Sequence, residues 1–425
     1  MTENTPPFDS TPPFDPTAPR ARTTDALEGI RPETLPDRDP QPPVPYDALV
    51  LVSFGGPEGQ DDVLPFLRNV TRGRGIPDER LEEVAHHYRH FGGVSPINDQ
   101  NRALQAALRV ELDGRGHDLP VYWGNRNWDP FLRDALQEAH AAGHRRLLAV
   151  VTSAYSSYSS CRQYREDLAG ALAETGLTGE LQIDKVRQYF DHPGFVSPFV
   201  EGVREALGRL REQLGPDADL RRDVHVLFAT HSIPNVTADS SGPPVAELGA
   251  EGAYGAQHRV VADVVMASVD AASDVGTGAS AASVPWSLVY QSRSGAPSTP
   301  WLEPDINDAI SALGEQGVKA VVIVPLGFVS DHVEVMWDLD EEAIQTAHEA
   351  GMLAERVATP GVHRDFVAGL VDLVEERLAR ADDPTVPVRP NRPALTALGP
   401  WYDVCRPGCC ANPREAKPAV AGLAP

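Results

Sequence analysis

The stretch YDALVLVSFGGP, residues 46–57, decides the fold class. Its apolar run is typical of a strand buried on both faces, and the Gly-Gly-Pro after it predicts a tight turn. Similar runs follow at 120–126, 146–152, 182–187, 223–230, 285–291, 318–325 and 353–358, with amphipathic helical windows such as 98–113, 129–142, 162–174, 195–213, 254–272 and 362–379. This alternation predicts an α/β fold of two similar Rossmann-like lobes, each a parallel four-stranded sheet flanked by helices.

Composition divides the chain into four parts. Residues 1–44 are rich in Pro, Asp and Thr and predict a disordered tail. We expect an N-terminal lobe at 45–205 and a C-terminal lobe at 206–380, with the small-residue segment 273–285 as a surface loop. Residues 381–425 predict an irregular C-terminal extension, which carries three of the four cysteines.

Charge and cysteine content exclude several classes of protein. The formal net charge is −24, from 61 acidic and 37 basic residues, which disfavours nucleic acid or an anionic membrane as a partner. The chain has no apolar run long enough for a transmembrane segment and no signal-peptide pattern, so we expect a cytoplasmic protein. Its four cysteines are too few and too uneven for a disulfide framework, which leaves a metal site or no function for them.

Two strand ends carry residues suited to metal chemistry. His231 lies just beyond the apolar run in HVLFATHSIP, and a helix starting near Val333 would place Glu334, Asp338 and Glu342 on one face. Ligands of doubly wound folds gather beyond the C-terminal ends of strands, and imidazole with carboxylate suits a divalent metal such as iron. A structural histidine and a solvated acidic helix face are the alternatives.

A third strand end predicts contacts to a flat ligand. The loop in VTSAYSSYSSCRQYREDL carries Tyr155, Tyr158, Tyr164 and Arg162, which can line an aromatic ligand and hydrogen-bond its edges. An ordinary surface loop is the alternative. Arginines gather after the first strand, as binding of a polycarboxylate would need, with scattered surface charges as the alternative. These are Arg68, Arg72, Arg74, Arg89 and Arg102.

Five motifs together resemble the ferrochelatase family, which inserts Fe(II) into a porphyrin: FGGPE, HFGGVSPIN, ATHSIP, YQSRSG with WLEPDI, and PLGFVSDHVEVMWDLD. The resemblance covers about residues 46–380. It is strongest to the actinobacterial type, which implies coproporphyrin III as the substrate, Fe-coproporphyrin III (coprohaem) as the product, and a place in haem b biosynthesis.

The resemblance assigns roles residue by residue. His231 and Glu334 match the catalytic metal-site pair, and Asp338 and Glu342 match the acidic path behind it. The implied porphyrin contacts are Phe54, Ser95, Tyr164 and Arg72. Phe54 departs from the tyrosine that many bacterial relatives carry, and phenylalanine cannot act as an axial ligand to iron.

The cysteines resemble the family subset that holds a 2Fe-2S cluster, which needs four thiolates. The implied ligands are Cys161, Cys405, Cys409 and Cys410. Such a cluster would pin the C-terminal extension to the loop after the third strand. Free thiols and a zinc site are the alternatives.

Three other readings of function stay open from the sequence. They are a protoporphyrin IX ferrochelatase, a chelatase for another metal and tetrapyrrole, and a non-enzymatic haem-, porphyrin- or solute-binding protein. For a coproporphyrin III ferrochelatase, we expect a monomer whose product passes to a coprohaem decarboxylase.

Overall fold

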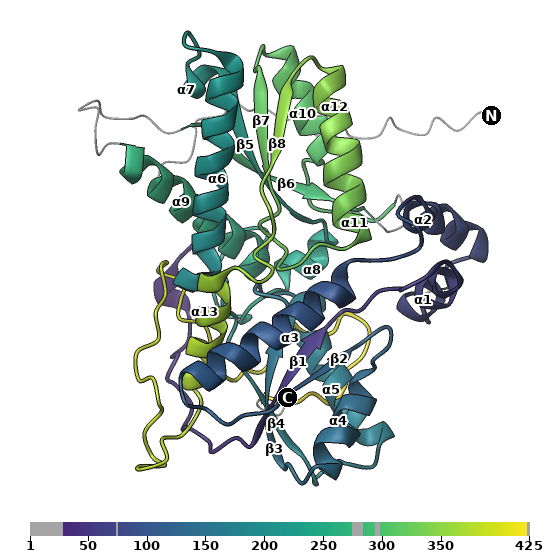
Figure 1. Ribbon diagram of the computed structural model, residues 1–425, viewed down its shortest axis with the longest axis vertical. Helices are drawn as coiled ribbons and strands as arrows, with labels where there is room; N and C mark the ends of the chain where they lie inside the picture. The colour runs from purple at the N-terminus through teal and green to yellow at the C-terminus, as the bar shows by residue number, and fades with distance from the viewer. Residues whose placement is uncertain (1–28, 74, 274–283, 294–297, 423–425) are drawn as a thin grey trace, which may run out of the picture.

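Two parallel four-stranded sheets form the framework of the protein, one in each lobe (Figure 1). The computed structural model describes residues 29–73, 75–273, 284–293 and 298–422. The N-terminal sheet has the order β2-β1-β3-β4 and the C-terminal sheet the order β6-β5-β7-β8, so both lobes share one topology. The strands are β1 Ala48–Ser53, β2 Val121–Asn125, β3 Arg146–Val151, β4 Gln182–Lys185, β5 Val224–His231, β6 Trp286–Gln291, β7 Ala320–Val324 and β8 Leu353–Arg356.

Strand β1 shows why the apolar run at its position forms a central strand. Leu49 and Leu51 point into a core shared by both lobes, while Val50 and Val52 pack on the opposite face of the sheet. Side chains alternate between the two faces of a strand, so a strand buried on both faces must be apolar throughout. Every residue of β1 is buried accordingly.

Helices cover both faces of each sheet (Figure 1). In the N-terminal lobe they are α1 Val63–Val70, α2 Asp78–His90, α3 Ile97–Gly114, α4 Leu132–Ala141 and α5 Gln163–Glu174. In the C-terminal lobe and at the junction they are α6 Pro193–Leu214, α7 Leu220–Asp223, α8 Asn235–Asp239, α9 Gly252–Ser273, α10 Ile306–Glu315, α11 Val333–Val335, α12 Ile344–Glu349 and α13 Arg364–Glu375. Short 3-10 helices span Pro32–Thr34 and Gln60–Asp62, and π-helical segments span Tyr158–Arg162 (η3) and Met336–Ala343 (η4).

The fold prediction is confirmed. All eight expected strands and the six expected helices are present, with ends that differ by four residues at most. The expected lobe boundary at 205/206 falls inside α6, which packs on α13, α9 and the C-terminal sheet. Helix α13 also packs on α3, and one apolar core runs through both lobes.

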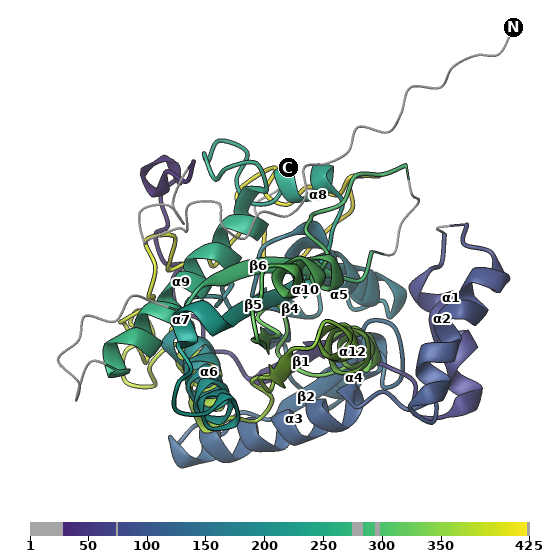
Figure 2. The same cartoon turned by 90° about the horizontal axis from the view of Figure 1, so that it is seen from above.

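Helices α1 and α2 stand apart from the two sheets (Figure 2). They have a small core of their own, which includes Phe66 and Leu81. Helix α2 also reaches α11 of the other lobe. This pair therefore borders the strand ends at which the candidate site residues lie.

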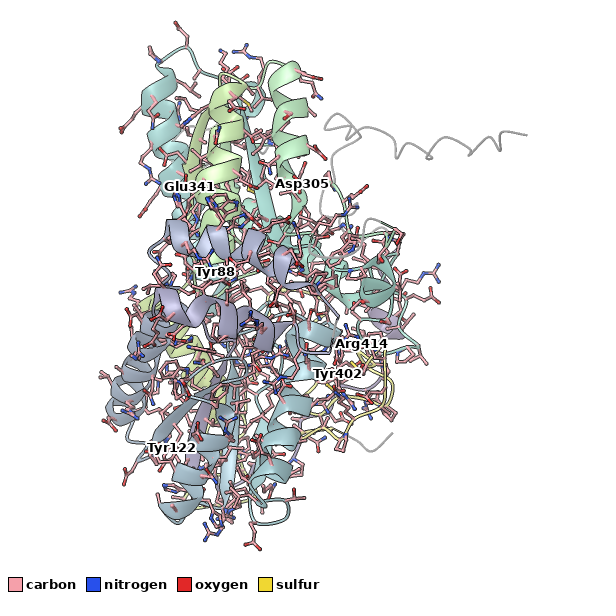
Figure 3. The ribbon with its side chains drawn as sticks, turned by 90° about the vertical axis from the view of Figure 1, so that its right-hand side faces the viewer. Tyr88, Tyr122, Asp305, Glu341, Tyr402 and Arg414 are labelled. Atoms are coloured by element: carbon pink, nitrogen blue, oxygen red, sulfur yellow. The ribbon has the colours of Figure 1, made fainter. Side chains whose placement is uncertain are left out.

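The C-terminal extension is irregular but well packed. Residues 381–422 contain no helix or strand, yet Trp401 is 1% exposed and packs on Phe190. Tyr402 and Arg414 mark the extension in Figure 3. Of the expected tail, residues 1–28 lie outside the described residues, as does 274–283 of the expected loop, while Ile30 pairs with Leu248.

Candidate active site

His231 and Glu334 meet at the C-terminal edge of the second sheet. His231 ends β5, and Glu334 lies in α11, beyond the end of β7. These are the two adjacent strands from which connections leave in opposite directions, which is where doubly wound sheets bind ligands. The His231 Nε2 atom is 3.3 Å from Glu334 Oε1, and the two side chains are 31% and 40% exposed.

Backbone groups fix the orientation of the imidazole. His231 Nδ1–H donates to the carbonyl of Ser232, so Nε2 faces Glu334. The Tyr254 hydroxyl donates to the His231 carbonyl over 2.8 Å, which holds the end of the strand. In metal-binding histidines, the hydrogen bond made by the other ring nitrogen, here Nδ1, sets the tautomer and the orientation of the ring.

The two side chains shift each other's pKa. Burial alone would lower the pKa of His231, but the Glu334 carboxylate outweighs burial and raises it to about 9. Burial would raise the pKa of Glu334, but the imidazolium overcomes this and lowers it to about 2. At neutral pH the metal-free pair is therefore imidazolium with carboxylate, and the imidazole must lose its proton before it can bind a cation.

Asp338 extends the acidic site to strand β6. Its Oδ2 accepts a hydrogen bond from Gln291 Nε2 over 3.2 Å and another from the Ser292 hydroxyl. Ser292 has a φ of 62°, an uncommon conformation for a residue with a side chain, and this turn aims its hydroxyl at Asp338. Burial and then the charge of Glu334 raise the pKa of Asp338 to about 7.

Gln291 and Ser292 belong to the motif YQSRSG, but no role was predicted for either residue from the sequence. Their position directly after an apolar strand was the signal that could have found them. His332, by contrast, caps α11 by accepting a hydrogen bond from the Val335 amide, which is a structural use.

The expected acidic helix begins at Val333, but it is not a regular α-helix. Residues 336–343 form the π-helix η4, a rare form that is frequent at functional sites. Glu342 accepts a hydrogen bond from Trp337 Nε1 over 2.8 Å, and Trp337 stacks on His87 of α2 at 4.0 Å between ring centroids. Glu342 is therefore hydrogen-bonded to the η4 residue, Trp337, that packs against α2.

The chain is similar in sequence to proteins of one known family. A family model described as ferrochelatase matches residues 46–378. This chain belongs to the ferrochelatase family. A protein of Leifsonia xyli subsp. xyli named coproporphyrin III ferrochelatase is 64% identical over 389 residues, or 90% of this chain and 96% of the relative.

Two further likenesses differ greatly in strength. A Tropheryma whipplei protein with the same name is 55% identical over 382 residues, 89% of this chain and 93% of its own. Among solved structures, SirB from Bacillus subtilis with Fe3+ covers 79% of this chain and 96% of its own at 10% identity, with a TM-score of 0.39. A likeness that weak assigns no function.

Two of the expected porphyrin contacts of this ferrochelatase-family chain share a neighbour, Arg126. Phe54 follows β1 and is 36% exposed, whereas Tyr164 is 5% exposed. The Arg126 guanidinium lies 5.6 Å from the Phe54 ring centre and 4.7 Å from that of Tyr164, and it pairs with Asp167 at 2.8 Å. Arg126 was missed because nothing in its sequence context marks it.

Ser95 and Arg72 occupy contrasting places. Ser95 is 3% exposed and packs beneath the turn at Gly56, where any side chain would overlap it. Arg72 is exposed in the turn after α1.

The expected arginine cluster is largely engaged with the protein's own carboxylates. Arg68 pairs with Asp78 at 2.7 Å and Arg89 with Glu82 at 2.7 Å, while Arg102 bonds Glu58. Arg74 lies outside the described residues. Of this set, Arg72 is the exposed cation for which the structure gives no ion pair within the described ranges.

The four cysteines gather in one buried cluster although 244 residues separate the first two (405 − 161). All four are free, with exposures of 8% or less. Cys161 lies in the π-helix η3, and the other three come from the extension: Cys405, Cys409 and Cys410.

Local geometry separates the adjacent Cys409 and Cys410. Cys410 has a φ of 52°, and its sulfur accepts a hydrogen bond from the amide of Gly242 at 3.3 Å. The two sulfur atoms are 3.9 Å apart. Two thiolates on one tetrahedral metal with bonds of about 2.3 Å would lie about 3.8 Å apart, so this spacing fits.

The thiols are nevertheless not set as a finished metal site. Among the described residues, no group of three or more His, Cys, Asp or Glu side chains has an arrangement ready to hold an ion. Hydrogen bonds from Cys161 and Cys409 lower the pKa of Cys405 well below its usual range, with buried cations adding to the effect. The set is four gathered thiols, one of them favoured as thiolate.

Among the described residues, no helix has both the length and the apolar character that a membrane span requires.

Proposed function

We propose that this protein inserts Fe(II) into coproporphyrin III to give coprohaem. The observation that carries the proposal is the His231–Glu334 pair at the ends of β5 and β7, the adjacent strands whose connections leave in opposite directions. The pair lies in a chain whose match to the ferrochelatase family spans residues 46–378. The coproporphyrin preference is supported by relatives of that name at 64% and 55% identity over about nine-tenths of the chain.

His231 and Glu334 act at the porphyrin centre. Metallation requires that two pyrrole protons leave and that the metal ion loses its water ligands. Glu334, ionised at neutral pH, attracts the incoming Fe(II) and takes part in proton removal. As the cation replaces the imidazolium beside Glu334, the proton on His231 leaves and Nε2 becomes able to bind the metal.

Asp338 and Glu342 form the hydrated path for protons or Fe(II) behind this pair. Asp338 is the first step, since Gln291 and Ser292 hold its carboxylate and its charge interacts with Glu334. Glu342 is the outer step, at the contact of Trp337 with α2.

The porphyrin lies against the first lobe in this proposal. Phe54 offers an exposed aromatic face, and Arg72 offers an exposed charge for a ligand carboxylate. Tyr164 and Ser95 are both buried, so they support the loops that bear these contacts and meet the ligand only if those loops move.

Anaerobic incubation with Fe(II) and either coproporphyrin III or protoporphyrin IX, followed by absorbance, tests the proposal. We expect faster metallation of coproporphyrin III. His231→Ala should abolish metallation and retain porphyrin binding, while His348→Ala, an exposed histidine on α12, should behave as the wild type. Near-normal turnover of His231→Ala contradicts the assignment, and binding of both porphyrins without metallation favours a non-enzymatic porphyrin-binding protein.

We further propose that Cys161, Cys405, Cys409 and Cys410 hold a 2Fe-2S cluster. Four buried free thiols supply the full ligand set, and the 3.9 Å sulfur spacing fits two thiolates on one iron. The cluster, when bound, supplies a covalent link between extension and lobe. Iron and acid-labile sulfide analysis of anaerobically purified protein tests this, and zinc without sulfide would contradict it.

The cluster should act as a structural staple. Cys161 belongs to the N-terminal lobe, and Cys410 touches Gly242 of the C-terminal lobe, so the group would tie three parts of the chain. Cys161→Ser should lose the iron and lower the unfolding temperature.

The location, the oligomeric state and the partner of the protein stay predictions. We expect a cytoplasmic monomer that passes coprohaem to a decarboxylase.

A further inference from the structure

Two cations are buried beside the four cysteines without a carboxylate partner. Arg165 of α5 is 1% exposed and Lys185, the last residue of β4, is 4% exposed. Within the described ranges, neither forms an ion pair with an acidic side chain. Fully buried Arg and Lys are rare without an anion, because burial of an unpaired ion costs several kcal/mol.

The hydrogen bonds of Arg165 hold it in place and leave its charge uncompensated. Its Nε donates to the Val420 carbonyl over 2.7 Å, and its own carbonyl accepts from the Val420 amide over 3.1 Å. Its Nη1 is buried without a hydrogen-bond partner in the described chain. Gly422 lies so close to Nη2 that any side chain there would overlap the guanidinium, and Gly422 pairs with Cys405.

Lys185 is fixed in a similar way. Its Nζ donates to the Val186 carbonyl over 2.7 Å and to Gln188 Oε1, both uncharged acceptors. Asp403 is the nearby acid, but it already pairs with Arg392 at 2.8 Å and Arg377 at 3.6 Å.

The groups near both cations that can carry balancing negative charge are the cysteines. Arg165 interacts electrostatically with all four sulfurs, and Lys185 with those of Cys161 and Cys405. Two ferric ions, two sulfides and four thiolates sum to a formal charge of about −2, which two cations neutralise. One-electron reduction makes the group more negative, so fixed positive charges favour the reduced form.

We propose that Arg165 and Lys185 are the fixed countercharges of the group held by the four cysteines and that they raise its reduction potential. The inference rests on the cluster proposed above. Both cations would act on that group through their charge, and neither belongs to the metallation site.

The test is a redox titration, followed by absorbance or electron paramagnetic resonance, of full-length protein purified anaerobically. Lys185→Met and Arg165→Gln should each change the ratio of oxidised to reduced cluster at least tenfold at a given potential, which is a fall of about 59 mV for a one-electron couple. Arg165→Lys, which keeps the charge, should stay close to the wild type.

Arg162→Gln is the matched control. Arg162 precedes the same helix next to Cys161, but it is already paired with Glu166 at 2.9 Å and its side chain is 20% exposed. Its loss should change the ratio less than threefold. Lys185→Met decides the matter alone if Arg165→Gln does not fold.

The outcomes separate the two proposals. A loaded Lys185→Met protein whose potential matches that of Arg162→Gln overturns the countercharge role and leaves the cluster standing. Wild-type protein without iron and sulfide overturns both the cluster and the countercharge role, and it leaves the ferrochelatase assignment untouched.

Discussion

Replacement of Glu334 by glutamine should remove the raised pKa of His231. The carboxylate is what raises that pKa to about 9 against the opposing effect of burial. Without it, burial dominates, and we expect the pKa of His231 to fall to its ordinary value near 6.5 or below it.

The magnitude follows from the geometry. Unit charges 3.3 Å apart attract by about 1 kcal/mol at the dielectric constant of water and about 5 kcal/mol at an effective value of 20. The rise of the pKa from about 6.5 to about 9 corresponds to about 3 kcal/mol, between these limits. Since the side chains are 31% and 40% exposed, solvent screening reduces the contribution to folding stability to about 1 kcal/mol.

The pH dependence has a defined sign for each partner. The folded pKa of His231 is raised, so its contribution to stability is full below about 6.5 and is lost as the pH rises through about 9. The folded pKa of Glu334 is lowered, so its contribution is full above its ordinary value and is lost as the pH falls through about 2. Both contributions are full at about pH 5 to 6.

Histidine NMR of the metal-free protein between pH 5 and 10 measures the effect, with His231→Ala to assign the resonance. Glu342→Gln is the matched control, because it removes the same charge from the same helical region while leaving the contact with Nε2 intact. A wild-type pKa near 6.5, or one unchanged in Glu334→Gln, would refute the reasoning.

Three further changes test other parts of the structure. Arg187→Met should lower the free energy of unfolding by about 3 kcal/mol in denaturant titrations, because Glu376, bonded to Arg187 at 2.8 and 3.0 Å, would stay buried with only the longer contact to Arg392 at 3.4 Å. Arg31→Gln, which breaks an ion pair more than half exposed, should cost under about 1 kcal/mol, and equal costs would contradict the distinction. Ser292→Ala should raise the pKa of Asp338 above about 7, because the hydrogen bond from the Ser292 hydroxyl lowers that pKa in the wild type. Infrared detection of the protonated Asp338 carboxyl measures the pKa, and a fall in the variant would contradict this prediction. Phe54→Tyr should leave stability within about 0.5 kcal/mol and shift the absorbance of bound coprohaem by adding an axial oxygen, whereas identical spectra would place Phe54 away from the iron.

The sequence by itself determined the framework. Apolar runs such as 48–52 are buried on both faces, so their pattern is unambiguous, and every expected strand is present. Two helices that flank the site, α2 and α10, were not anticipated. Helix α2 is mostly polar and buries only Leu81 and Ala85, so its apolar periodicity is weak.

The sequence also supplied the site residues that end strands or carry a family motif. His231 and Glu334 were expected at one edge because parallel strands end on the same side of a sheet, and the structure brings them to 3.3 Å. Whether they perform the chemistry is what the His231→Ala assay decides.

Tertiary structure alone decided which charges meet. The burial of Arg165 and Lys185 beside the cysteines and the π-helical form of residues 336–343 depend on contacts between segments far apart in the chain. Local sequence encodes backbone preference and burial pattern, but the electric field at a site is a sum over all neighbours in space. For this reason the opening strand could be read from twelve letters, whereas the countercharges of the cysteines could not.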